Sequence, residues 1–345
     1  MSARRILFHC LVVGAGLLVG RLNAEPTNSP PGAITNLVAG KTGVSALVID
    51  TNDPVEAAYY KILQDDDAAE KDIISWTEHP TTLSGADAGG AREMLRERIR
   101  QRLDEVKHEY EDFIGMHPNH AHIRLAYGSF LNDTHDEEGA VAQWEKAREL
   151  DPGNPAAWND LANYYGHRSP VKKAFEYYAK AIELDPRQSI YYYNLAVTVY
   201  LFRADAEAYY NLNEQQVFDK ALELYRKAIA LDPDNFILYS DYAQSFYGTK
   251  PPRWQDGLKA WTEALKIAHD DVERQGVFVH LARINVKLGH YDEAQRDLEH
   301  VTFHQYDKLK RAITRNLNAA TGHSDTNNAP TNAPSPAPKS PAPPP

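Results

Sequence analysis

The sequence has very little cysteine. Its 345 residues include a single cysteine, Cys10, and only 3 methionines. One cysteine cannot form an internal disulfide, and it cannot supply a cysteine cluster for zinc. Cys10 lies in an apolar stretch near the start of the chain. If the chain is cut after Ala24, the remaining protein has no thiol, which also excludes thiol catalysis.

Positive charge is also scarce. The chain has 37 Lys and Arg against 48 Asp and Glu, which gives a formal net charge of −11. No basic stripe stands out in the sequence, and this argues against nucleic acid and anionic membrane surfaces as partners. We therefore expect no nucleic-acid partner, with a slight preference for a basic or neutral protein.

Apolar runs are short, and the most informative one lies near the start. Arg4 and Arg5 precede an uncharged run from Ile6 to Gly20, and Ala24 is a small residue suited to cleavage. This pattern is typical of a secretory signal peptide, predicted here over residues 1–24. We expect export to the periplasm or the extracellular space, with no membrane span after cleavage. An uncleaved anchor remains the alternative, although the run is short for a spanning helix.

Motifs for catalysis and cofactor binding are missing as well. Gly40-Lys41-Thr42 resembles the end of a phosphate-binding loop, but position 35 is Thr where that loop needs Gly. His117, His120 and His122 lie close together without a cysteine, so capping or solvated histidines are favoured over a metal site. The run 65–67 is Asp-Asp-Asp without the spaced ligands of a calcium loop, which favours a solvated charge run. We expect no enzyme activity, no cofactor and no metal.

A Leu-Asp-Pro phrase recurs, each time after the same apolar pattern. It occurs at 150–152, 184–186 and 231–233, and a helical pattern Ala-x-x-x-aromatic-x-x-Ala precedes each copy. Pro152 and Pro186 are 34 residues apart. A fixed period of this length indicates stacked helix-turn-helix units, because no single pair of helices can bury its apolar face alone. Proline cannot continue a helix and restricts the residue before it, so each second helix should end at this phrase.

The repeated unit resembles the tetratricopeptide repeat family. The signature residues of the unit 155–188 are Trp158, Leu161, Ala162, Tyr165, Ala174, Tyr178, Ala181 and Pro186. The resemblance implies an all-α, right-handed α-solenoid with a C-terminal capping helix at 305–318. It places five repeats in 119–308, at 121–154, 155–188, 189–235, 236–274 and 275–308. Trp158 and Tyr178 should be buried between helices.

The remaining segments are assigned by pattern. Residues 25–53 form a linker, 54–118 a degenerate N-terminal helical pair, and 319–345 a Pro-rich disordered tail. In the N-terminal pair we expect one helix from Pro54, a second short helix around Ile73, and a long helix over 91–115. The third repeat carries 13 extra residues, roughly 203–216, which should extend both of its helices. In helical arrays such insertions often determine specificity, and a neutral extension is equally open.

In this family the first helix of each pair lines a concave groove that binds peptides. Transferred to this chain, the resemblance implies a partner-binding site at Asn159, Asn163, Tyr193, Tyr200, Gln244, Tyr247, Arg283 and Lys287. One subclass clamps a C-terminal carboxylate with lysines, an arginine and two asparagines. Asn163 and Asn194 match the asparagines, but Asn159, Ile237 and Asp241 stand where the cations belong, so that clamp is absent.

The sequence thus predicts an exported scaffold that binds a protein or an extended peptide. Amides can hydrogen-bond a peptide backbone, and tyrosine rings can pack its side chains. Two alternatives remain: a cell-envelope glycan or peptidoglycan binder, and a regulatory subunit of an envelope enzyme. The partner's identity and the oligomeric state do not follow from the sequence.

Overall fold

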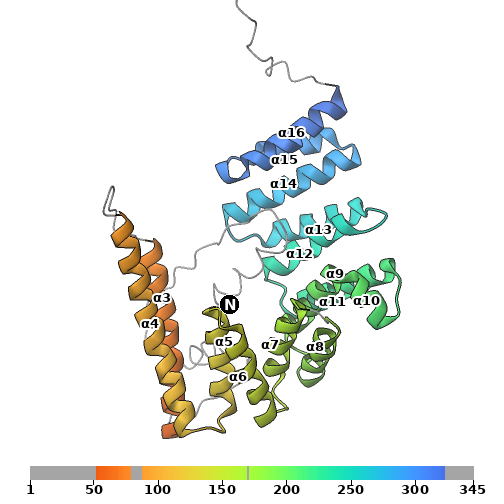
Figure 1. The fold of residues 1–345 in the computed structure, drawn as a ribbon. Helices are drawn as coiled ribbons and strands as arrows, with labels where there is room; N and C mark the ends of the chain where they lie inside the picture. The colour runs from red at the N-terminus through yellow and green to blue at the C-terminus, as the bar shows by residue number, and fades with distance from the viewer. Residues whose placement is uncertain (1–51, 79–87, 169–170, 323–345) are drawn as a thin grey trace, which may run out of the picture. The chain divides into compact units, whose positions relative to one another are not determined.

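The computed structural model describes residues 52–78, 88–168 and 171–322, and every regular element within these ranges is helical (Figure 1). The expected all-α solenoid of stacked helical pairs is confirmed. None of the helices in the described ranges is long and apolar enough to cross a membrane. The predicted signal peptide, most of the linker and nearly all of the Pro-rich tail lie outside the described residues.

The chain divides into two compact units, residues 1–251 and 252–345. The described helices of the first unit are α3 (Pro54–Glu78), α4 (Ala88–Met116), α5 (Ala121–Asp133), α6 (Glu137–Leu150), α7 (Pro155–Gly166), α8 (Lys172–Leu184), α9 (Ser189–Leu201), α10 (Arg203–Tyr210), α11 (Glu214–Leu231), α12 (Phe236–Ser245) and the 3-10 turn η1 (Phe246–Gly248). Those of the second unit are α13 (Trp254–Ile267), α14 (Asp271–Leu288), α15 (Tyr291–Glu299), η2 (His304–Tyr306) and α16 (Asp307–Thr321).

The Leu-Asp-Pro phrases end the second helices, as predicted. Helices α6, α8 and α11 all stop at the leucine of the phrase. The aspartate is the C-cap in each case, and the backbone N–H of Asp151, for example, donates to the carbonyl of Ala147. An asparagine then starts the next helix in two of the three cases. Asn154 accepts a hydrogen bond from the N–H of Ala156, and Asn235 accepts one from Ile237, which satisfies an otherwise unpaired backbone donor.

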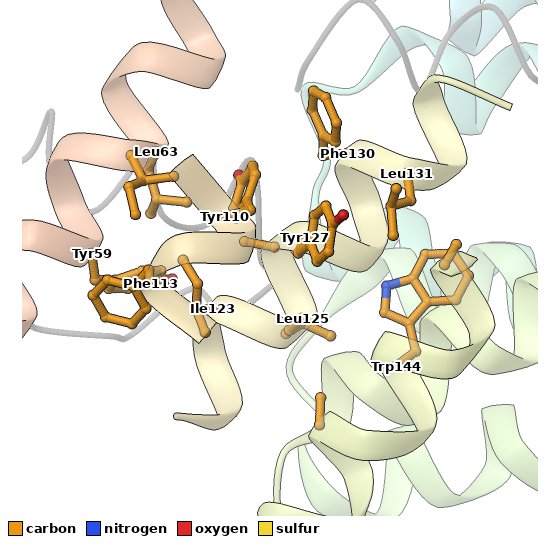
Figure 2. Packing of buried hydrophobic residues seen from close by; sticks show 14 of the residues in the cluster. Tyr59, Leu63, Tyr110, Phe113, Ile123, Leu125, Tyr127, Phe130, Leu131 and Trp144 are labelled. Atoms are coloured by element: carbon orange, nitrogen blue, oxygen red, sulfur yellow. The ribbon is translucent and has the colours of Figure 1, made fainter. Parts of the chain in front are cut away.

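Small residues and aromatic rings at repeated positions make the core. In the first repeat, Gly128 of α5 lies against the ring of Trp144 of α6. That ring belongs to a cluster that continues through Tyr127 and Tyr110 to Tyr59 of α3 (Figure 2). Fully burying one such side chain contributes about 1.5–3 kcal/mol, so neighbouring pairs stabilise each other.

The two aromatic residues singled out in the second repeat have different environments. Tyr178 is only 3 % exposed, which confirms the prediction. The prediction for Trp158 is wrong, because its ring is half-buried. The Trp158 indole N–H donates to the carbonyl of Pro152 at 3.0 Å, and the guanidinium of Arg148 lies 4.9 Å from the ring centre. The ring lies between Arg148 of α6 and Tyr177 of α8, whose ring centre is 5.1 Å away, but these contacts leave it partly exposed.

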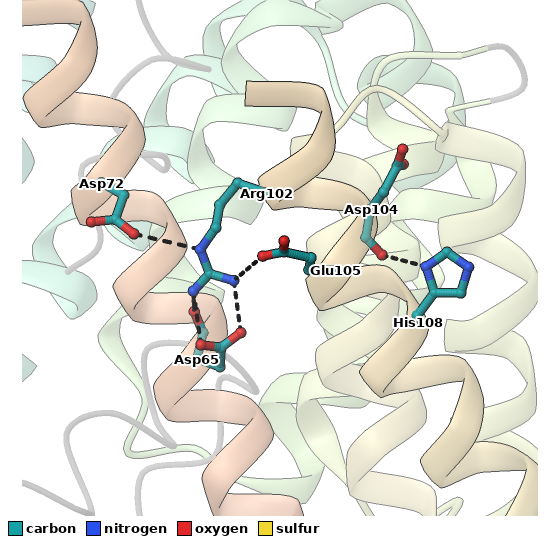
Figure 3. Close-up of polar contacts among 6 residues, drawn as sticks. All are labelled: Asp65, Asp72, Arg102, Asp104, Glu105 and His108. Carbon is teal, nitrogen blue, oxygen red and sulfur yellow. Dashed lines mark hydrogen bonds and ion pairs between the residues drawn. The ribbon is translucent and has the colours of Figure 1, made fainter. Parts of the chain in front are cut away.

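The N-terminal pair differs from the expectation in two respects. Helix α3 runs unbroken for 25 residues, where two shorter helices were expected. The aspartates in its middle are not a solvated charge run. Arg102 of α4 donates to both carboxylate oxygens of Asp65, at 2.7 and 2.9 Å (Figure 3). Asp66 is 1 % exposed and accepts a hydrogen bond from Tyr110 at 2.9 Å. These contacts join α3 to α4.

The insertion in the third repeat also differs from the expectation. It does not extend both helices, because α9 ends at Leu201 and a separate helix, α10, begins at Arg203. Only α11 is lengthened, to 18 residues. Asn211, with a left-handed φ of 52°, ends α10, and a capping box between Asn213 and Gln216 starts α11. The rings of Tyr209 and Tyr210 lie 5.2 and 5.5 Å from the ring of Phe175 in α8.

Candidate functional site

The proposed binding residues lie where the repeat pattern places them along the chain. In the first unit, Asn159 and Asn163 are on α7, Tyr193 and Tyr200 on α9, Gln244 on α12 and Tyr247 in η1. Arg283 and Lys287 are on α14 of the second unit. We call the part formed by α7, α9 and α12 the first-helix face, because each is the first helix of its pair. Side-chain contacts join these three helices.

Two of the predicted site residues are buried. Asn159 is 2 % exposed, and its Oδ1 accepts a hydrogen bond from Asn194 of α9 at 3.0 Å. Tyr193 is also 2 % exposed, and its hydroxyl donates to Asp241 of α12 at 2.6 Å. Burial, and next the negative charge of Asp241, raise the pKa of Tyr193. The expectation that these side chains form an open surface is wrong, since they join successive first helices.

Four other predicted residues are half-buried: Asn163, Tyr200, Gln244 and Tyr247. Asn163 accepts a hydrogen bond from the Tyr178 hydroxyl at 2.8 Å through its Oδ1. Gln244 makes only a long contact with Asp241, 3.4 Å from Nε2 to Oδ1. Burial raises the pKa of Tyr200. Amide groups with remaining donors and acceptors can pair with a peptide backbone.

The sequence did not single out Asn194 and Asp241 as site residues, although both are central. Asp241 accepts from Tyr193 and from Gln244, so the first-helix face carries a carboxylate among amides. Asp241 is the residue that stands where the carboxylate-clamping subclass has a cation. The register of the repeat could have identified both residues, but their bonding partners lie 35 and 48 residues away in sequence.

The cationic pair of the second unit has a different environment. Arg283 and Lys287 are exposed, one turn apart on α14. Helical residues four apart lie on the same side of a helix. The two residues therefore form a local cationic spot on α14, within the second unit.

His120 has a structural role at the start of α5. Nδ1 of His120 accepts a hydrogen bond from the N–H of Ile123 at 3.1 Å, so His120 is the N-cap of α5. Its ring lies 5.0 Å from that of Tyr59, and Nε2 lies 3.3 Å from Glu56. An accepting Nδ1 requires the neutral ring with its proton on Nε2. The capping interpretation is confirmed for His120, and no group of three or more metal-ligating side chains occurs within the described ranges.

Comparison with known proteins supports the repeat assignment. Residues 133–189 match the family described as tetratricopeptide repeat. No curated protein matches the chain by sequence. Among solved structures, the C-terminal part of a repeat protein from Cytophaga hutchinsonii is 13% identical, covers 76% of this chain and 99% of that one, and has a TM-score of 0.50. At this identity the likeness shows the fold alone.

Two further solved structures are similar, with lower TM-scores. PilF of Pseudomonas aeruginosa is 12% identical, covers 76% of this chain and 100% of that one, and has a TM-score of 0.47. YrrB, described as having an unusual peptide-binding site, is 14% identical, covers 60% of this chain and 97% of that one, and has a TM-score of 0.46.

Proposed function

We propose that this chain, which is a tetratricopeptide-repeat protein, is an exported, non-catalytic scaffold that binds an extended peptide or protein segment on its first-helix face. Export rests on Arg4, Arg5 and the apolar run that ends at Gly20. The N-terminal residue of the secreted chain should then be Glu25, and an intact Met1 would contradict export.

The observation that carries the binding proposal is that two half-buried amides, Asn163 and Gln244, lie on helices joined by side-chain hydrogen bonds. The bond between Asn159 and Asn194 joins α7 to α9, and the bond between Tyr193 and Asp241 joins α9 to α12. These ties link the helix that carries Asn163 to the helix that carries Gln244, through α9 of the repeat between them. A preorganised row of donors and acceptors costs less entropy when it captures an extended chain. The carboxylate of Asp241 on this face favours a segment that is neutral or basic.

Crosslinking tests the binding proposal. A photoreactive amino acid at position 244 of the full chain, expressed in its native envelope, should capture a protein, identified by mass spectrometry. The same group at position 295, an exposed residue of α15, should not capture it. Captured glycan instead of protein would support the cell-envelope glycan alternative. No specific adduct at position 244 would contradict the proposal.

A pair of variants separates binding from folding. Asn163→Ala removes an amide from the face and also leaves the Tyr178 hydroxyl without this acceptor, at a cost of about 1 kcal/mol. Tyr178→Phe removes the same hydrogen bond from its buried end and keeps the amide. We expect Asn163→Ala with Gln244→Ala to reduce capture about tenfold, which corresponds to about 1.4 kcal/mol. Tyr178→Phe should leave capture unchanged, and equal losses would mean that only folding was affected.

A further inference from the structure

Helix α16 is the last described helix of the second unit, and one of its sides is covered. It packs against α14 and α15, and Figure 1 shows it at the end of this stack of helices. Ile313 and Leu317 are its buried residues. In the turn before it, the hydroxyl of Tyr306 donates to the carbonyl of Val272 in α14 at 2.8 Å. These contacts fix the orientation of α16, and the side opposite Ile313 and Leu317 carries exposed residues.

Three cations lie along the exposed side of α16. Lys308, Arg311 and Arg315 are all exposed, and they are separated by three and four residues, which places them on one side of the helix. Lys308 and Arg315 are about 10 Å apart along the helix axis. Within the described part of the chain, none of the three takes part in an ion pair or a side-chain hydrogen bond. We call these three residues the α16 row.

Few carboxylates offset this row. The only carboxylate of α16 is Asp307, whose Oδ2 lies 3.3 Å from Nδ1 of His304. The other carboxylates of residues 252–322 belong to α13, α14 or α15, or precede α14 as its N-cap. Exposed cations of those helices include Lys266 and Arg296, which lie 2.7 and 3.0 Å from the carboxylate of the residue three positions earlier. Helix α16 has four cations and one carboxylate, so it is locally basic on a chain of net charge −11.

An exposed aromatic ring lies at the end of α16 where the row begins. Among the described residues of the second unit, Phe303 is the one large apolar side chain that is exposed, at 37 %. The backbone that carries it is held in place, because Oε1 of Gln275 in α14 accepts from the N–H of Thr302 at 2.7 Å and from that of Phe303 at 2.8 Å. An aromatic ring on a fixed backbone loses little entropy on binding and is typical of interface anchors.

We propose that the α16 row and Phe303 dock an acidic segment of another protein. A helical segment with carboxylates separated by three and four residues repeats the spacing of the row, and arginine pairs with carboxylates through two hydrogen bonds. An apolar residue at the end of the segment would pack on Phe303. A lipid surface fits less well, because the apolar side of α16 is buried in the unit and cannot enter a membrane. This surface lies in the second unit, so it is a site additional to the first-helix face.

Two helical probe peptides test the proposal on the full chain. Both have leucine at each end and three positions between them separated by three and four residues, with glutamate there in one peptide and glutamine in the other. We expect the glutamate peptide to bind about tenfold more tightly in fluorescence anisotropy, with a preference that shrinks as salt rises. A chain with net charge −11 would repel this peptide without a local basic surface. Equal binding of the two peptides, or no binding of either, overturns the proposal.

Charge removal supplies the matched variants. Changing all three residues of the α16 row to glutamine should weaken the glutamate peptide about tenfold and leave the urea midpoint unchanged, because these side chains have no partners to lose. The control changes Lys259, Lys266 and Arg296 to glutamine, which removes the same charge from exposed positions of α13 and α15. It should leave binding unchanged. Similar losses in both variants would show a net-charge effect only and overturn the proposal.

Two further measurements test the ring and the competing partner. Phe303→Ala keeps the backbone N–H that Gln275 holds and should weaken both peptides by the same factor, about threefold, at any salt concentration. Unchanged affinity would overturn the assignment of Phe303 as the anchor. Sedimentation of the chain with phosphatidylglycerol vesicles, lost in the glutamine variant of the α16 row while the two peptides bind alike, would show a lipid surface as the partner and overturn the proposal.

Discussion

The absence of a side chain at Gly128 allows α5 and α6 of the first repeat to pack closely. A Cβ atom built on Gly128 would lie 2.4 Å from the indole nitrogen of Trp144, which is 4 % exposed. We predict that Gly128→Ala lowers the free energy of unfolding by about 1–3 kcal/mol through overpacking. The gain in helix propensity, about 1 kcal/mol at most, works in the opposite direction. Urea unfolding measures the change.

Gly90→Ala is the matched control for this substitution. Gly90 is also helical, in α4, and a Cβ atom at this position would have no neighbouring atom within 4 Å. The control substitution should leave stability unchanged or raise it slightly. If the two substitutions shift the midpoint alike, close packing against Trp144 is not the reason for glycine at position 128.

The repeat pattern predicted single residues well where burial depends on one helical pair. Ala162, Ala174 and Tyr178 are all buried. It failed where burial depends on the neighbouring pair. Tyr193 is closed over by α12, which supplies Asp241 from 48 residues away. A periodic pattern tells which side of a helix a residue is on, but it does not tell how deeply the next pair covers that side.

At the scale of elements, the spacing of the repeat positions located the insertion in the third repeat. It did not predict that the inserted residues form a separate helix, α10. The signal was present in the sequence, because Asn213 and Gln216 have the spacing of a capping box and mark the start of a new helix. The continuous helix α3 was missed for another reason. Its aspartates are typical of a loop when read locally, whereas Arg102 and Tyr110, 37 and 44 residues further on, supply the partners that place them within a helix.

Helix α10 covers the preceding repeat, and this makes it structural. Phe175 of α8 is fully buried, with Tyr209 and Tyr210 beside it. We predict that replacing residues 203–216 by a short turn lowers the stability of the first unit, because Phe175 becomes exposed. Phe175→Ala alone should cost about 3–5 kcal/mol. Combined with the deletion it should cost much less, because the two changes remove the same contact. Additive losses in urea unfolding would show that α10 acts elsewhere.

At the scale of the whole molecule, the repeats do not form a single compact unit. The division at residues 251 and 252 falls between α12 and α13, within the expected repeat 236–274. The dipeptide Pro251-Pro252 lies at that division, but the repeat signature does not reveal it, because the signature residues continue through Gly257, Trp261 and Ala264, all of which are buried. A change that destabilises one unit should therefore affect the stability of that unit more than the stability of the other.

The second unit contains a histidine whose burial makes this independence measurable. The ring of His280 in α14 stacks on that of Trp261 at 4.1 Å and nearly parallel to it. Burial, and next the charge of Arg283, lower the pKa of His280 to about 3. The folded state then binds fewer protons than the unfolded state between the ordinary histidine pKa, about 6.5, and this lower value. Stability is therefore lost as pH falls through that window.

We predict that the second unit unfolds more readily at pH 5 than at pH 7, and that His280→Phe reduces this dependence by about 1–2 kcal/mol. Phenylalanine keeps a ring against Trp261 and cannot take a proton. Hydrogen exchange of α13 to α16 assigns the effect to this unit, because burial also lowers the pKa of His122 in the first unit. His304→Phe is the control, since its side chain is 99% exposed. If it flattens the pH dependence as much as His280→Phe does, the stacked ring is not the group that titrates.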